Sequence, residues 1–205
     1  MKFIYIPVLS LLVFAGCANT EIYTFRTGEE LAQTYSNLLL VIDFPNSGDR
    51  YFAENAFVKS FKAKGLDITT ASEVMSNIRE RDDREVRSLL SEHSIDGILV
   101  ITPALSTDKA LISGMDKRED STLTWCNRLL YFGNPNSEFF ASDEELYTDS
   151  WGKFTCRLYD AETGERTWVA VSTTNESGLG DFEDLMTSNS ETTVEKLVAD
   201  NIIRQ

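Results

Sequence analysis

The chain has 205 residues, of which 42% are hydrophobic and 25% charged, a composition that fits one domain with a full core and leaves little room for two. Its formal net charge is −14, and its densest run of arginines, residues 79–87, is interrupted by acids. A chain this acidic repels phosphate backbones and anionic lipids, so we expect no nucleic-acid partner. Any membrane attachment must come from acyl chains rather than from charge.

A hydrophobic leader opens the sequence and ends at a cysteine. Lys2 gives it a positive start, residues 3–14 are almost all apolar, and the small residues Ala15 and Gly16 precede Cys17. The apolar run is too short to span a hydrocarbon core, which needs about twenty residues. Small residues at its end are typical of a signal peptide. We therefore expect residues 1–16 to be a signal peptide.

The junction Phe14-Ala15-Gly16-Cys17 resembles the lipobox of bacterial envelope lipoproteins, with Phe14 where that family usually has Leu, Val or Ile. The resemblance implies that Cys17 carries acyl chains such as palmitate and becomes the new amino terminus. It further implies a lipid anchor in the cell envelope, in the outer membrane facing the periplasm. Residues 17–36 are then expected to be a polar tether between the anchor and a single α/β domain over residues 37–205.

The first half of the domain alternates strands and helices. The run 38–44 is continuously apolar and is typical of a strand buried on both faces. A helix over 50–64 follows, with Phe52, Ala53 and Phe57 on its inner side, then a strand at 66–70, further helices from Ser72 to near His93, and a second buried strand at 97–102. Such an order predicts a parallel β-α-β-α-β unit with right-handed crossovers.

The second half changes pattern. Residues 153–160 and 166–173 alternate polar and apolar around a Gly-containing loop, which predicts an antiparallel hairpin, and an amphipathic helix over 182–203 ends the chain. The fold class is therefore α/β (α+β mixed) with one mixed sheet. The segment 105–149 shows no sustained period, and we expect it to be irregular.

This layout resembles small α/β domains of envelope lipoproteins: the curli secretion-channel subunit, the lipoprotein activators of penicillin-binding proteins, and the amino-terminal domain of the Tol translocation protein. The residues that carry the resemblance are 40–44, 95–100 and the hairpin 158–168, with its aspartate, small loop, glycine and tryptophan. The resemblance implies a binding or assembly role without a shared catalytic residue.

Two cysteines remain if Cys17 is acylated. Cys126 and Cys156 are an even pair in a compartment that permits disulfides, and a bridge between them would contribute on the order of 3 kcal/mol. Two buried free thiols are the alternative. Both interpretations place Cys156 inward, because it shares the apolar side of its strand with Phe154 and Leu158.

Few residues offer catalytic or ligand-binding chemistry. His93 is the only histidine, so a multi-histidine metal site is excluded, and we expect no metal or cofactor. Asp43 ends the first predicted strand, at the edge where parallel sheets bind ligands, and it could cap the amides that follow or act as an acid–base group. Residues Asn46, Ser47, Gly48 and Asp49 join that strand to the helix, a place suited to a small anion.

The irregular segment is rich in aromatic residues: Trp125, Tyr131, Phe132, Phe139 and Phe140. Core packing and a partner surface are both consistent with them. The sequence predicts a lipid-anchored, non-catalytic envelope protein that binds another envelope protein. The alternatives are an acid–base hydrolase using Asp43 and a receptor for a small anion at residues 46–49.

Overall fold

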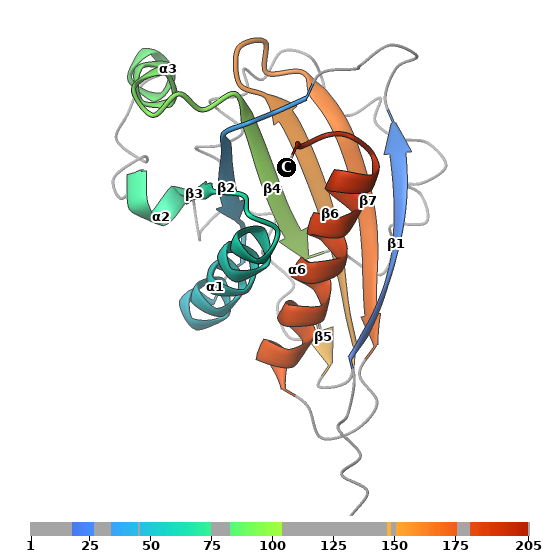
Figure 1. Cartoon of the computed structure of the whole chain (residues 1–205). Helices are drawn as coiled ribbons and strands as arrows, with labels where there is room; N and C mark the ends of the chain where they lie inside the picture. The colour runs from blue at the N-terminus through green and yellow to red at the C-terminus, as the bar shows by residue number, and fades with distance from the viewer. Residues whose placement is uncertain are drawn as a thin grey trace, which may run out of the picture.

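A mixed β-sheet runs through the chain in the order β1-β7-β6-β4-β2-β3, with the short β5 paired to β6 (Figure 1). The computed structural model describes residues 18–26, 34–44, 46–74, 83–103, 147–148, 151–175 and 181–204. The strands are β1 (Asn19–Arg26), β2 (Leu38–Ile42), β3 (Ile68–Thr70), β4 (Gly97–Pro103), β5 (Tyr147–Thr148), β6 (Trp151–Asp160) and β7 (Arg166–Asn175). The helices are α1 (Ser47–Ala63), α2 (Ala71–Val74), α3 (Asp83–Glu92) and α6 (Phe182–Ala199).

The expected fold class is confirmed. Strands β3, β2 and β4 are parallel, and β4, β6, β7 and β1 are antiparallel neighbours. The two continuous apolar runs became β2 and β4, which lie side by side inside the sheet with almost every residue buried. A run that is apolar on both faces can satisfy burial only where helices cover both sides of the sheet.

Helices cover both faces. Leu38, Leu40 and Ile42 belong to the larger core cluster, which also includes side chains of α1 and α6. Leu39 and Val41 point the other way, into a second cluster that includes Val86 and Leu90 of α3 and Ile98 and Val100 of β4. Burying each Leu or Ile stabilises the fold by roughly 1.5–3 kcal/mol, so both layers contribute to stability.

Gly97 allows a close approach at the start of β4. A Cβ atom there would lie 2.6 Å from Leu38 Cδ2 and 2.8 Å from Tyr35 Cδ1, closer than side chains can tolerate. Tyr35 itself is held by its backbone N–H, which donates to Ile202 O at 2.8 Å. The glycine therefore lets the chain before β2 and the end of the last helix pack against β4.

Residues 19–26 depart from the expected polar tether. They form β1, which pairs with β7 from Asn19 opposite Asn175 to Arg26 opposite Trp168. Its inward residues include two threonines, Thr20 and Thr24, beside Ile22. Polar inward residues conceal the strand period from a count of hydrophobic side chains.

Two helices have other limits than the sequence predicts. Helix α1 begins at Ser47, three residues before the expected start at residue 50. Helix α6 ends at Ala199 rather than at residue 203, and Asn201, just after its end, adopts a positive φ of 57°. Of the segment 105–149, the structure describes only Tyr147 and Thr148, which form β5. Among the described helices, none combines the length and the apolar character needed to cross a bilayer.

Candidate functional site

The carboxyl ends of β2, β3 and β4 meet at one edge of the sheet, and charged side chains gather there. Asp43 follows β2, and its backbone N–H donates to Ile101 O of β4 at 2.9 Å. The residue is 7% exposed, and no described residue donates a hydrogen bond to its carboxylate. Burial raises the pKa of Asp43 to about 7, although the positive charges of Arg50 and Arg157 oppose that shift.

The two arginines are held by other acceptors. Arg50, in the first turn of α1, donates from Nη2 to Phe44 O at 3.1 Å, while its Nε is buried without a hydrogen-bond partner. Arg157 of β6 donates from Nη1 to Thr102 Oγ1 of β4 at 3.0 Å. The positive charges of Arg50 and Arg157 therefore act on the Asp43 carboxylate, although neither arginine forms a hydrogen bond with it. Its proton can therefore exchange near neutral pH.

A second buried carboxylate lies one helical turn along α1. Glu54 is 9% exposed, and Ser72 Oγ of α2 donates to its Oε2 at 2.6 Å. Burial raises the pKa of Glu54, while the Ser72 hydrogen bond and the Arg50 charge lower it and the Glu73 charge raises it further. We call Asp43, Arg50, Glu54, Thr102 and Arg157 the carboxyl-end cluster.

The chemistry of this cluster centres on a carboxyl group that changes charge near pH 7. A group with such a pKa can give or take a proton under working conditions, and perturbed carboxyls are enriched at functional sites. Structural networks perturb pKa values as well. Sequence reasoning found Asp43 from its place after a buried strand, but it missed Arg50, Glu54 and Arg157, which only the tertiary structure brings near it.

Residues 46–49 are occupied by a helix cap. The side-chain oxygen Oδ1 of Asn46 accepts hydrogen bonds from Gly48 N at 2.7 Å and Asp49 N at 3.4 Å. Asn46 is thus the N-cap, and the expectation that Asp43 would cap these amides is wrong. An anion at residues 46–49 would compete with Asn46 for the same amides, and that site remains a prediction.

The other predicted site residues fall into two groups. Cys17, Cys126, Tyr131, Phe132, Phe139 and Phe140 lie outside the described residues. Cys156 has no exposed surface and no disulfide partner among the described residues, and its Sγ lies 3.8 Å from Thr193 Oγ1. Burial raises the pKa of this thiol to about 12, so it stays protonated and unreactive at neutral pH. The bridge to Cys126 remains a prediction. In the described ranges no three His, Cys, Asp or Glu side chains are grouped so as to hold a metal ion.

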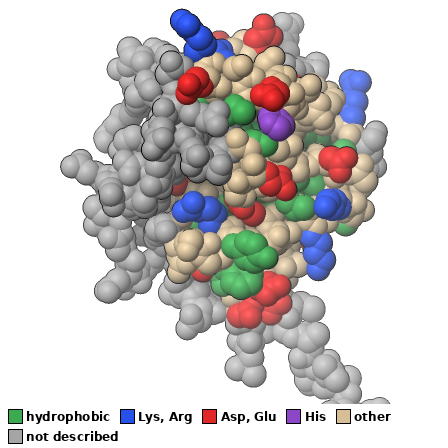
Figure 2. Space-filling model, turned by 90° about the vertical axis from the view of Figure 1, so that its left-hand side faces the viewer, with side chains coloured by type: hydrophobic (Ala, Val, Ile, Leu, Met, Phe, Trp, Pro, Cys, Tyr) green, Lys and Arg blue, Asp and Glu red, His purple; other side chains and the backbone are tan. Residues whose placement is uncertain are grey.

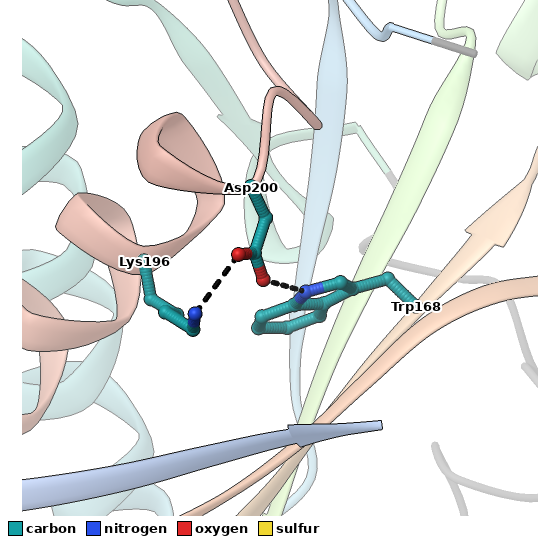
Figure 3. A network of polar contacts seen from close by, with 3 residues as sticks. All are labelled: Trp168, Lys196 and Asp200. Atoms are coloured by element: carbon teal, nitrogen blue, oxygen red, sulfur yellow. Dashed lines mark hydrogen bonds and ion pairs between the residues drawn. The ribbon is translucent and has the colours of Figure 1, made fainter. Parts of the chain in front are cut away.

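The aspartate and the tryptophan of the hairpin at residues 158–168 have structural roles. Asp160 Oδ1 accepts hydrogen bonds from Thr163 N at 2.7 Å and Thr163 Oγ1 at 2.8 Å, which closes the turn. Trp168 is fully buried, and its Nε1 donates to Asp200 Oδ2 at 3.0 Å (Figure 3). Lys196 Nζ contacts the other oxygen of Asp200 at 2.9 Å, so the end of α6 is tied to β7.

An exposed aromatic pair lies on α1. Tyr51 is 64% and Phe52 43% exposed, and their rings meet edge to face with centroids 6.0 Å apart. Phe52 was expected on the inner side of the helix, but the buried stripe runs through Ala53, Ala56 and Phe57 and leaves Phe52 at its margin. Figure 2 shows the face of the molecule that lies on the left in Figure 1. Hydrophobic side chains gather toward the lower end of that face, with acidic side chains just below them.

No family model matches the sequence, and no curated protein matches it either. Among solved structures, the PelC dodecamer from Paraburkholderia phytofirmans covers 91% of this chain and 99% of its own at 12% identity and a TM-score of 0.44. A single-residue variant of that PelC covers 86% and 98% at 13% identity and a TM-score of 0.45. Similarity at this level is too low to carry a function from PelC to this chain.

Proposed function

We propose that this chain is a lipid-anchored envelope protein, held at the periplasmic side of the outer membrane, that acts through protein contacts rather than by catalysis. The leader and its terminal Cys17 support the anchor. The observation that carries the proposal is that the folded domain is reached within one residue of Cys17. Ser188 Oγ of α6 donates to Ala18 O at 3.3 Å, and β1 begins at Asn19. An acyl group on Cys17 would therefore hold the domain at the membrane.

Palmitate labelling tests the anchor. In cells fed radiolabelled palmitate, we expect the full-length chain to take up the label and to fractionate with the envelope membranes. Cys17→Ser should lose both properties, whereas Cys126→Ser, the matched control, should keep them. Label that persists in Cys17→Ser, or a cytoplasmic location of the unaltered chain, contradicts the proposal.

The partner-binding part of the proposal needs a separate measurement. The aromatic residues Tyr131, Phe132, Phe139 and Phe140 remain its proposed surface. If Phe139 and Phe140 contact a partner, the double variant Phe139→Ala/Phe140→Ala should keep its melting temperature and lose the protein crosslinked to it in intact cells. A large drop in melting temperature would assign both side chains to the core.

Acid–base chemistry is a second candidate function, favoured by one observation. Asp43 has a pKa of about 7 and no described hydrogen-bond donor, at the sheet edge where α/β proteins bind ligands. A hydrolase screen of the purified domain tests it. Activity that Asp43→Asn abolishes without unfolding the domain would establish an enzyme, and activity that survives this substitution would exclude Asp43 as the catalytic group.

A further inference from the structure

We infer that the anchored domain rests on the bilayer with the carboxyl end of its parallel strands toward the lipid, and that Tyr51 and Phe52 of α1 lie in the bilayer interface. The inference rests on the proposed acylation of Cys17 and goes beyond it, because an anchor alone does not fix which end of a domain meets the membrane. The partner that we propose for this end of the domain is a layer of zwitterionic lipid headgroups.

The starting point is the fixed position of Ala18. Besides the Ser188 contact to Ala18 O, Thr20 Oγ1 lies 2.8 Å from both Ser188 Oγ and Thr174 Oγ1. Asn19 pairs with Asn175 of β7. These contacts fix Ala18, the residue after the proposed acylation site in the sequence, against α6 and the start of β1.

The strand directions show which end of the domain this is. Strand β1 is antiparallel to β7, β7 to β6, and β6 to β4, while β4 is parallel to β2. Strand β1 therefore runs opposite to β2 and β4, and its first residue lies at the edge where those two strands end. In Figure 1 the start of β1 and the arrowheads of β2 and β4 all point to the lower end of the molecule.

The aromatic pair lies at the same end of the domain, because Tyr51 and Phe52 are near the start of α1, which begins shortly after β2 ends. Helices α1 and α6 run in the same direction, because Ser60 Oγ contacts Ser190 Oγ at 2.8 Å and Lys64 Nζ contacts Glu195 Oε1 at 2.9 Å. Both helices therefore begin at this end, where the rings of Phe44 and Phe182 lie with their centroids 6.0 Å apart. Ser188, which contacts Ala18, lies seven residues after the N-cap Asp181, which corresponds to about 10 Å of helix.

The side chains suit an interface. Tyr51 and Phe52 are the described large hydrophobic residues exposed on α1, and their rings already contact each other. Aromatic rings concentrate at the boundary between headgroups and hydrocarbon, where an apolar body and a polar hydroxyl are both satisfied. The net charge of −14 disfavours anionic lipids, so a zwitterionic surface is the one that this end can approach.

Photocrosslinking in living cells tests the orientation. The full-length chain would carry Phe52→p-benzoylphenylalanine, which keeps an aromatic ring at an exposed position, and cells would contain radiolabelled phospholipid. The matched control is Glu162→p-benzoylphenylalanine, in the exposed turn between β6 and β7 at the opposite end of the sheet. We expect a lipid adduct at position 52 at least ten times stronger than at position 162.

Three results would overturn the inference. They are a protein adduct instead of a lipid adduct at position 52, equal lipid adducts at both positions, and no lipid adduct at position 52 in protein that is palmitate-labelled and membrane-bound. Each of them leaves the proposed anchor intact. A chain that is neither labelled with palmitate nor recovered with membranes removes the anchor and the orientation together.

Discussion

The carboxylate of Asp43 lies at the end of β2, largely withdrawn from water, with the charges of Arg50 and Arg157 facing it. Burial favours the neutral form, and its effect on the pKa exceeds that of the two arginines. The ionised form therefore costs the folded protein stability. The same feature gives Asp43 a proton that it can exchange near neutral pH.

Replacing Asp43 should change how stability depends on pH. The pKa is about 7 in the folded protein and near its ordinary value of 3.8 in the unfolded chain, so between these values the folded state holds a proton that the unfolded state has released. Stability must then fall as pH rises through this window, by up to about 4 kcal/mol at 1.36 kcal/mol per pKa unit. Asp43→Asn should be more stable than the unaltered protein at pH 8 and similar to it at pH 4, as measured by urea unfolding.

The exposed acid Asp67 supplies the control for this measurement. Asp67→Asn should follow the unaltered protein across the same pH range. Equal pH dependence in both variants would mean that Asp43 is ionised in the folded protein at neutral pH, with its charge stabilised by the arginines.

The thiol of Cys156 permits a direct chemical test. Its pKa of about 12 and complete burial predict no reaction with iodoacetamide at pH 8 in the folded protein. After unfolding without reductant we expect complete alkylation, read by mass spectrometry. Alkylation that requires a reductant would establish the bridge to Cys126, and Cys126→Ser should then remove that requirement.

At the scale of single residues, sequence position located some features and not others. Asp43 could be singled out because a charged residue directly after a buried strand must lie at the sheet edge. Arg157 could not be linked to it, since the register between β4 and β6 brings Arg157 opposite Val100, beside Thr102. Such pairings depend on strand register, which a local pattern does not contain.

At the scale of elements, the strands with strong apolar patterns were predictable almost to the residue. The expected 97–102 and 166–173 correspond to β4 and β7, because continuous or alternating burial leaves few other arrangements. The start of α1 was not predictable, since Asn46 and Asp49 are both good caps. In the structure Asn46 is the N-cap, because its backbone is extended, with φ −82° and ψ 128°, as the N-cap position requires.

The contact between α6 and β7 gives a prediction at this scale. Asp200→Ala should destabilise the protein by about 1–3 kcal/mol, because the buried Nε1 of Trp168 would lose its acceptor. Lys196→Ala should cost no more than about 0.5 kcal/mol, because an ion pair four residues apart on a helix, with a lysine side chain that is 31% exposed, contributes little. Urea unfolding followed by circular dichroism measures both. Equal losses in the two variants would show that the ion pair, rather than the indole hydrogen bond, holds the end of α6.

At the scale of the whole molecule, β1 attaches the described residues nearest to Cys17 in the sequence to the edge of the sheet. It was missed because its inner side is mostly threonine, yet it covers β7, whose residues are largely buried on both faces. The stretch from Asn19 to Arg26 is thus part of the domain, and the anchor proposed on Cys17 would be attached to the sheet itself. A flexible tether would instead let an anchored domain turn freely above the bilayer.

Truncation tests whether residues 19–26 are part of the folded domain or a flexible tether. We expect a soluble chain that begins at Ala18 to unfold cooperatively, and a chain that begins at Thr27 to lose on the order of 2–4 kcal/mol. Ladder hydrogen bonds contribute roughly 0.5–1.5 kcal/mol each, and the entropy of ordering the strand offsets part of that gain. The shorter chain should also aggregate, because the eight residues of β7 that pair with β1 would become an uncovered edge. Urea unfolding and light scattering measure the two effects. Equal stability of the two chains would make β1 a dispensable tether and would remove the fixed point on which the membrane orientation depends.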